Sequence, residues 1–115
     1  MSRLEVTEYR VDHSCVILHP SHSLAKRRKL YFEETLDHES VSVSPGSMTE
    51  IMLRRHAAIA GKTLTHRVEA STFDSACRIV AAGLGLAISP REAVEPTARA
   101  LGLKMVALQD DWAHR

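Results

Sequence analysis

Residues 68–90 read VEASTFDSACRIVAAGLGLAISP and contain the most regular pattern of the chain. Between two strand-like segments, apolar residues recur at the spacing of one helix face: Phe73, Ala76, Cys77 and Val80. Gly83 follows where a glycine commonly ends a helix in the left-handed conformation. The apolar run at 84–89 is typical of a strand buried on both faces. The stretch therefore predicts a strand, a helix and a second strand that pack together.

Similar patterns extend in both directions along the chain. Strands are predicted where short apolar or alternating runs occur, at 14–18, 41–44, 64–68 and 103–108. Helices are predicted between them, at 31–37, 48–60 and 91–101, and the last residues, 110–115, are expected to form a loose tail. Alternation of this kind builds a mostly parallel sheet with helices on both faces. We predict an α/β fold of three layers (αβα) around a mostly parallel five-stranded sheet.

Three of the predicted helices begin with a serine that is followed three residues later by an acid. The pairs are Ser47 and Glu50, Ser71 and Asp74, and Ser89 and Glu92. Each predicts a capping box, in which the serine oxygen accepts a first-turn N–H and the acid accepts the serine's own N–H. Acids used in this way are poor candidates for general bases. Behind parallel strands, the three helix N-termini would share one sheet edge, where α/β sheets bind ligands and N–H groups favour anions.

Size and composition restrict the class of protein. The 115 residues are expected to form one domain, with a core over about 14–109. Lys and Arg total 15 against 14 for Asp and Glu, and aromatic residues make up 4%, so neither a basic footprint nor a stacking surface for nucleic acid is visible. No run approaches the roughly 20 apolar residues of a membrane helix, and residues 1–10 lack the apolar stretch of a signal peptide. We therefore expect a cytoplasmic protein.

Cysteine and histidine give little sign of metal or disulfide chemistry. Cys15 and Cys77 lie in apolar strand and helix patterns, which indicates reduced core thiols, and a disulfide between them stays open. His19 and His22 are closely spaced, but no further Cys or His follows at the spacing of a metal site. His66 lies in a predicted strand and is interpreted as a hydrogen-bonded sheet residue. We expect no metal and no cofactor.

The remaining motifs have simple structural interpretations. Gly83 and Gly85 follow a helix and precede a strand, whereas the dinucleotide fingerprint needs glycines after a strand and before a helix. The basic segment 26–29, KRRK, is either a solvated helix face or a patch for nucleic acid or a protein partner, and the solvated face is favoured. The Gly-x-Ser-x-Gly, phosphate-loop and His-Glu-x-x-His motifs are absent, so no enzyme class is indicated.

Several segments resemble the effector-binding domain of LysR-type transcriptional regulators. Residues 16–25 end in HSLA, which resembles the "HPLA" turn of that family, with Ser23 in place of the usual proline. Residues 31–36 resemble the short helix that follows this turn. Residues 68–90 closely resemble the family's strand, helix and "VAAGLGIA-x-x-P" segment, and residues 103–110 resemble the strand and "pl-D" that come next. The similarity covers nearly the whole chain, and VAAGLGLA is fairly specific.

The resemblance implies one lobe of a type II periplasmic-binding-protein-like fold. The family carries a winged helix-turn-helix, a linker helix and two lobes, whereas residues 1–115 resemble only the second lobe. The helix-turn-helix and first lobe are therefore expected to be absent from this chain. The resemblance also implies homo-oligomers, either dimers or tetramers, that contact DNA only through the helix-turn-helix.

A small-molecule inducer, often a carboxylate or another metabolite, is implied between the two lobes of the family. On this chain the resemblance assigns inducer binding to residues at the starts of three helices: Ser44, Pro45, Gly46, Ser47, Met48, Ser71, Thr72, Phe73, Ser89 and Pro90. These are the positions that the capping pattern also selects. The leading hypothesis is an inducer-sensing domain of a LysR-type bacterial transcription regulator that works by population shift.

Two other classes stay open on the sequence. A fragment of a periplasmic solute-binding protein would have the same kind of fold, and a secretion signal in the gene would favour it. A small α/β enzyme would require turnover that depends on a specific side chain in the crevice.

Overall fold

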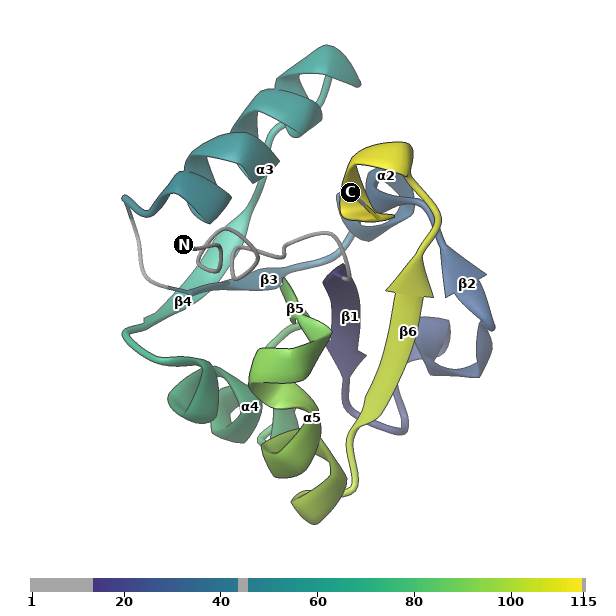
Figure 1. Ribbon diagram of the computed structural model, residues 1–115, viewed down its shortest axis with the longest axis vertical. Helices are drawn as coiled ribbons and strands as arrows, with labels where there is room; N and C mark the ends of the chain where they lie inside the picture. The colour runs from purple at the N-terminus through teal and green to yellow at the C-terminus, as the bar shows by residue number, and fades with distance from the viewer. Residues whose placement is uncertain (1–13, 44–45, 115) are drawn as a thin grey trace, which may run out of the picture.

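A computed structural model describes residues 14–43 and 46–114 of the chain (Figure 1). Its strands are β1 (Ser14–Leu18), β2 (Lys29–Leu30), β3 (Ser40–Val43), β4 (His66–Ala70), β5 (Ala87–Pro90) and β6 (Lys104–Leu108). Its α-helices are α2 (Phe32–Thr35), α3 (Met48–Ile59), α4 (Phe73–Ala81) and α5 (Arg91–Ala100). Two short 3₁₀ helices, η2 (Ser23–Lys26) and η3 (Asp111–His114), complete the described elements.

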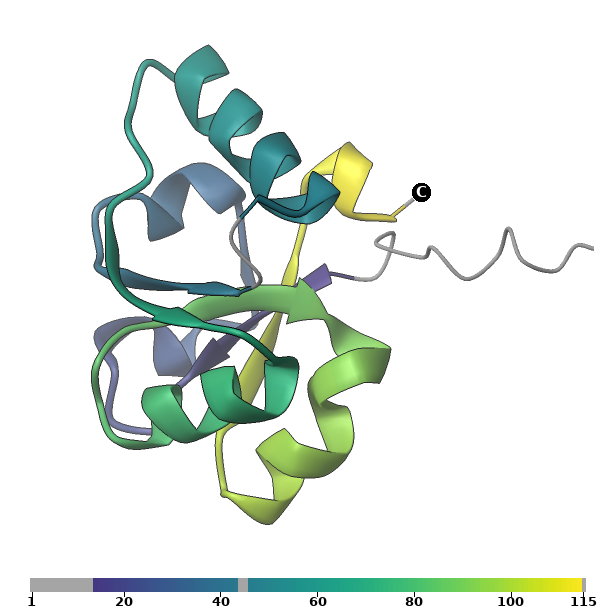
Figure 2. The same ribbon diagram turned by 90° about the vertical axis from the view of Figure 1, so that its left-hand side faces the viewer.

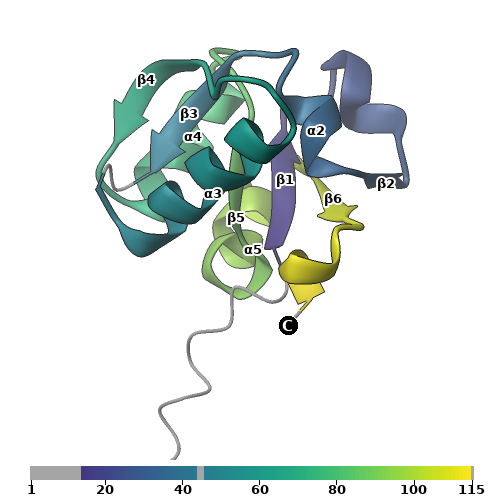
Figure 3. The ribbon, with the colours of Figure 1, turned by 90° about the horizontal axis from the view of Figure 1, so that it is seen from above.

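The strands form a mixed sheet in which only β1 runs against its neighbours. Four strands pair in the order β2-β6-β1-β5, with β1 antiparallel to both β5 and β6. β3 and β4 pair in parallel, and a parallel bridge between Ser40 and Leu86 joins β3 to the start of β5. Viewed from above, β4 and β3 lie on one side of β5 and β1, with β6 and β2 on the other (Figure 3). The predicted mostly parallel sheet is confirmed, although the prediction missed β2 and the direction of β1.

The direction of β1 is not encoded in its sequence. All five residues of this strand are buried, so it appears as a continuous apolar run in either orientation. Its side chains alternate between two core clusters. Val16 and Leu18 belong to the cluster under α2, α3 and η3, whereas Cys15 and Ile17 belong to the cluster under α4 and α5. The three layers, helices above and below the sheet, are visible in Figure 2.

The C-terminal segment is part of the core, so the expectation of a loose tail was wrong. The Phe32 N–H donates to Asp110 Oδ1 at 2.8 Å, which fixes the start of η3 beside α2. The Trp112 ring stacks on His56 of α3, with centroids 4.3 Å apart, and meets Phe32 edge-on at 5.6 Å. Ala113 is fully buried. These contacts join residues far apart in sequence, which a local pattern does not reveal.

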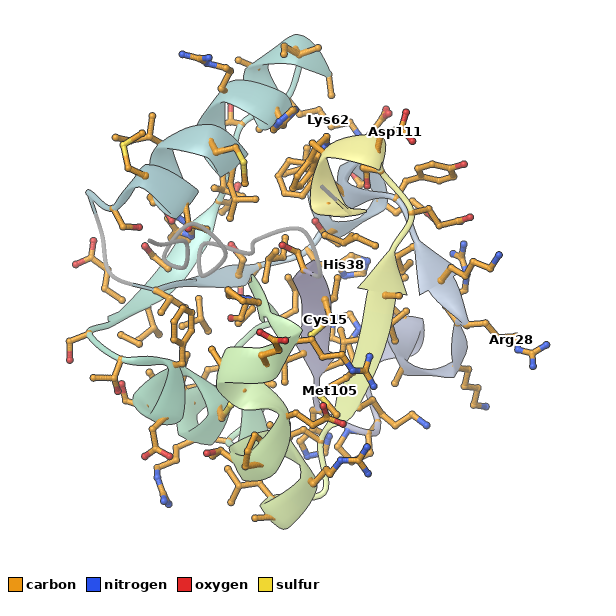
Figure 4. All side chains as sticks on the ribbon, viewed as in Figure 1. Cys15, Arg28, His38, Lys62, Met105 and Asp111 are labelled. Carbon is orange, nitrogen blue, oxygen red and sulfur yellow. The ribbon has the colours of Figure 1, made fainter. Side chains whose placement is uncertain are left out.

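The cysteines and the basic segment behave largely as predicted. Cys15 and Cys77 are buried and free, which confirms the reduced core thiols. Residues 26–29 are all exposed, and Arg28 points away from the sheet (Figure 4). The segment is not a helix face, however, because it leaves η2 and enters the edge strand β2. Among the described residues, no helix has the length and apolar character needed to cross a membrane, and no group of side chains is arranged to hold a metal ion.

Candidate functional site

The predicted ligand-binding residues that the structure describes lie where three parallel strands end and three helices begin. β3 ends at Val43, β4 at Ala70 and β5 at Pro90, and α3, α4 and α5 follow. In Figure 2 these strands run toward the same side of the molecule, which is the carboxyl edge of that part of the sheet. Within the described residues, the predicted sharing of one edge by three helix N-termini is confirmed.

The first helix start follows half of the predicted capping pattern. Ser47 is the N-cap of α3, and its Oγ accepts the Glu50 N–H at 3.2 Å. The Glu50 carboxylate does not complete the box, because it is directed into the protein and is 5% exposed. The sequence prediction of a reciprocal cap is therefore wrong for this acid.

The second helix starts one residue later than predicted. Thr72, not Ser71, is the N-cap of α4, and it forms a capping box with Ser75. The Ser75 N–H donates to Thr72 Oγ1 at 3.0 Å, and the Thr72 N–H donates to Ser75 Oγ at 3.3 Å. Asp74 instead accepts hydrogen bonds from Arg78 at 3.1 Å and from Thr97 at 3.2 Å. These two bonds hold the pKa of Asp74 below its ordinary value, with Arg78 the larger cause.

The third helix start has no side-chain cap. Pro90 is the N-cap of α5, and Ser89 is the preceding residue of β5, so the predicted box with Glu92 is wrong. Ser89 is 1% exposed, and its Oγ has no hydrogen-bond partner in the described part of the structure. A buried hydroxyl without a partner is unfavourable, which makes Ser89 the polar group on this edge with the most to gain from a partner.

A pocket of about 240 Å³ opens between α3 and the strands β3 and β4. Apolar side chains from α3, β3 and β5 form most of its wall, together with Phe73 at the start of α4. Its polar lining residues are Thr35, Ser40, Ser47, Thr49, Glu50 and His66. Of the ten predicted site residues, Ser47 and Phe73 line this pocket.

The other predicted residues surround this pocket or lie below the surface. Gly46, Met48, Ser71 and Thr72 are exposed on the same edge, Pro90 is half-buried and Ser89 is buried. Ser44 and Pro45 lie outside the described residues.

The polar end of the pocket is a buried network centred on Glu50. Glu50 Oε2 lies 2.5 Å from His66 Nε2 and 3.1 Å from Arg54 Nε, and Oε1 accepts from Ser42 Oγ at 3.3 Å. The Glu50 side chain is 6% exposed, whereas that of Arg54 is 55% exposed. The negative charge of Glu50 is therefore balanced by the Arg54 guanidinium near the surface, and its oxygens form hydrogen bonds with Ser42 and His66 inside. Burial without such partners would be costly for this charge.

Ser40, His66 and Glu50 form a chain that has the connectivity of a serine–histidine–acid triad. Ser40 Oγ lies 3.1 Å from His66 Nδ1, on the ring side opposite the carboxylate. However, Ser40 Oγ donates its hydrogen to the Thr65 carbonyl oxygen at 3.0 Å. The single hydrogen of the hydroxyl is therefore directed to Thr65, and His66 presents Nδ1 to the serine and Nε2 to the acid, the reverse of the arrangement in a catalytic triad. The network joins β3, β4 and α3 through side chains of all three elements.

Comparison of the sequence with protein families identifies the chain. The family model described as "LysR substrate binding domain" matches residues 1–115. The chain belongs to the LysR substrate-binding domain family. The recognition made from HSLA and VAAGLGLA is thereby confirmed, as is the fold that it implied.

Solved structures of LysR effector-binding and regulatory domains have the same fold as this LysR substrate-binding domain. The effector-binding domain of QuiR in complex with shikimate gives a TM-score of 0.75 at 16% identity and is matched over 95% of this chain and 54% of that chain. The CcmR regulatory domain of Synechocystis PCC6803 in complex with 2-PG gives 0.71 at 15% identity, over 84% and 47%. The BenM effector-binding domain with its effector benzoate gives 0.67 at 17% identity, over 86% and 46%. The chain thus spans about half of each domain, and no curated protein matches it.

The sequence reasoning missed the charged network of this LysR substrate-binding domain. His66 was correctly interpreted as a hydrogen-bonded sheet residue, but its partner Glu50 was assigned to a cap. One signal could have found it. Glu50 has helical spacing with Leu53 and Ala57, which are the other buried residues of α3. This spacing indicates that the acid lies on the buried face of the helix.

Proposed function

We propose that this domain senses a small anionic metabolite for a LysR-type bacterial transcription regulator. The observation that carries the proposal is the pocket of about 240 Å³ at the edge where α3 and α4 begin, with Ser47 and Phe73 in its lining. Family membership supports small-molecule binding at such a site. Two molecules bound in similar structures, shikimate and benzoate, are carboxylates, which supports an acidic inducer.

The charges around the pocket favour an anion over a cation. First-turn N–H groups of α3 and α4 are directed toward this edge, and helix N-termini stabilise negative charge. Inside the pocket, the Glu50 carboxylate already faces Arg54 and His66. A ligand carboxylate would meet the first-turn N–H groups, while Phe73, Leu53 and Ile88 cover its apolar part. The proposed contact residues are the ten assigned above, together with His66.

A binding experiment on the 115-residue chain tests the site. Shikimate and benzoate serve as probes in NMR titrations, in which perturbed amide resonances identify the contact residues. We expect perturbations at Ser47 and Phe73, and a weaker affinity in Ser47→Ala, since Ser47 lines the pocket. Lys104→Gln, an exposed change on β6, is the matched control. Perturbations confined to residues outside the pocket, with Ser47→Ala binding as the unchanged chain does, would refute this assignment.

We propose binding, not catalysis, as the activity of this domain. The triad-like chain in the described residues ends in a serine whose hydroxyl hydrogen is directed to the Thr65 carbonyl oxygen and not to His66. An esterase assay with p-nitrophenyl acetate therefore should give equal rates for the unchanged chain and for Ser40→Ala. A rate that depends on Ser40 would favour the enzyme alternative.

We also propose that the domain pairs with a second copy in the cytoplasm and affects DNA through a helix-turn-helix region of a longer protein. Three large apolar side chains of α3 are exposed to solvent: Met48 at 78%, Ile51 at 48% and Ile59 at 75%. Apolar exposure on one helix is typical of a surface covered by a partner. Sedimentation of the chain should show self-association that Ile59→Asp reduces. A strict monomer would contradict this part of the proposal.

A further inference from the structure

A second pocket lies at the edge of the sheet opposite the proposed inducer site. It measures about 280 Å³ and is more polar than the first. Figure 2 shows that β1 ends at this edge, while β3 and β5 begin there. Its lining residues come from the three segments that meet at this point: His19, Ser21, His22, His38, Glu39, Gly83, Leu84 and Gly85.

Two of the three histidines are held in a defined tautomer by their own backbone. The Ser21 N–H donates to His19 Nδ1 at 3.0 Å, and the Leu24 N–H donates to His22 Nδ1 at 3.0 Å. A ring nitrogen that accepts a hydrogen bond carries no hydrogen, so the neutral ring has its hydrogen on Nε2. Each of these rings therefore presents an Nε2–H donor on the side away from its own turn.

The third histidine places another imidazole beside these donors. The rings of His22 and His38 have centroids 4.8 Å apart and are tilted by 58°. Burial lowers the pKa of His22, and the neighbouring His38 and His19 lower it further. The rings are thus close enough for positive charges on them to repel each other. A bound negative charge would remove that repulsion.

We propose that the pocket formed by His19, His22 and His38 binds a small oxyanion, a carboxylate or a phosphate. Imidazole N–H groups donate to such oxygens in charge-assisted hydrogen bonds. A metal ion is disfavoured because an Nε2 that carries hydrogen has no lone pair to coordinate it, and the described residues contain no group arranged as metal ligands. Glu39 stands exposed at the rim, where solvent screens its charge.

Close backbone packing keeps the floor of this pocket in place. A side chain at Gly85 would bring its Cβ within 3.0 Å of the Glu39 carbonyl oxygen, and the residue has φ of +149°. The Leu86 N–H donates to the same carbonyl at 3.1 Å. The 83–85 turn is therefore packed directly against the segment that carries His38 and Glu39.

Asparagine variants test the site without removing the turns. Asparagine supplies a side-chain oxygen that can accept the Ser21 or Leu24 N–H, but it lacks the Nε2–H donor. NMR titrations of the 115-residue chain with inorganic phosphate and, separately, with acetate should perturb the His19 and His22 side-chain nitrogens. We expect His19→Asn and His22→Asn each to raise the phosphate Kd by about tenfold, since a hydrogen bond to a charged group is lost. The anion that binds with the lower Kd, phosphate or acetate, shows whether the pocket prefers a phosphate or a carboxylate.

Two further variants separate this proposal from its rivals. Glu39→Gln removes a negative charge from the rim, so it should tighten phosphate binding, whereas it would weaken a cation site. Arg28→Gln tests whether the exposed basic segment 26–29 is the true anion contact, and it should leave the affinity unchanged. Equal phosphate affinity in both asparagine variants and the unchanged chain, or loss of binding in Arg28→Gln, would overturn the proposal. Ser47→Ala should leave the phosphate-induced shifts of the His19 and His22 side-chain nitrogens unchanged, which keeps this outcome independent of the inducer site.

Discussion

Replacing His66 with alanine is the sharpest test of the buried network. The change removes the donor that lies 2.5 Å from the Glu50 carboxylate and also the contact with Ser40. Glu50 stays buried, and the ion-pair partner that remains among the described residues is Arg54, whose side chain is half-exposed. An exposed ion pair contributes at most about 1 kcal/mol, whereas a hydrogen bond to a charged group contributes roughly 1.5–3 kcal/mol.

We therefore expect His66→Ala to lower the free energy of unfolding by about 2–3 kcal/mol. Urea denaturation followed by circular dichroism measures this change, and the melting temperature should fall by roughly 10 °C. Glu50→Gln removes the carboxylate to which His66 is hydrogen-bonded. The double variant should therefore be more stable than the sum of the two single losses predicts, with a coupling of about 1–3 kcal/mol.

The control for this cycle is Arg78→Gln, which breaks the exposed Arg78–Asp74 ion pair and should change stability by less than about 0.5 kcal/mol. The reasoning would be refuted if His66→Ala cost no more than this control. It would also be refuted if the two single losses simply added, because Glu50 and His66 would then be energetically independent.

Three further outcomes follow from the structure. Trp112→Ala should destabilise the domain by about 2–4 kcal/mol, measured by urea denaturation, since the indole contacts both Phe32 and His56; an unchanged midpoint would mean that η3 is not anchored. Burial raises the pKa of Cys15 to about 12, so iodoacetamide should leave it unmodified at pH 8 in the folded chain and alkylate it in urea, as mass spectrometry would show. The pKa of His22 is lowered on folding, so the unfolded chain binds this proton more readily and stability should fall as pH drops through the ordinary histidine value of 6.5. His22→Asn should reduce that pH dependence, and an identical profile would contradict the contribution of His22.

The sequence was a good guide to the elements because helix and strand periods are local properties. Phe73, Ala76, Cys77 and Val80 predicted α4, and the buried residues of α4 are Ala76, Cys77 and Val80. The sequence was a poor guide to where helices begin, because neighbouring residues compete for the N-cap position. Ser71 and Thr72 are both good caps, and Thr72 is selected because Ser75 stands three residues after it. Ser89 stays in the strand because it pairs with Cys15 of β1.

Site chemistry was harder to predict for a related reason, since it depends on contacts between distant segments. Ser47-x-x-Glu50 satisfies the capping pattern, and although helical spacing puts Glu50 on the buried face of α3, no local pattern identifies His66, 16 residues away, as its partner. That partner becomes available only when β3 and β4 pair with Ser40 opposite His66. The same holds for the second pocket, because His19, His38 and Gly85 meet only where β1 ends and β3 and β5 begin.

The position of α3 connects ligand binding to the exposed apolar surface. This helix buries only three of its residues, Glu50, Leu53 and Ala57, so its packing on the sheet is light for twelve residues. Two of these, Glu50 and Leu53, also line the proposed inducer pocket. We infer that a ligand in the pocket acts on the placement of α3, and any difference in its affinity between two placements is the free energy available to shift the population. Because Met48, Ile51 and Ile59 are carried on the same helix, any such shift moves the surface proposed for self-association.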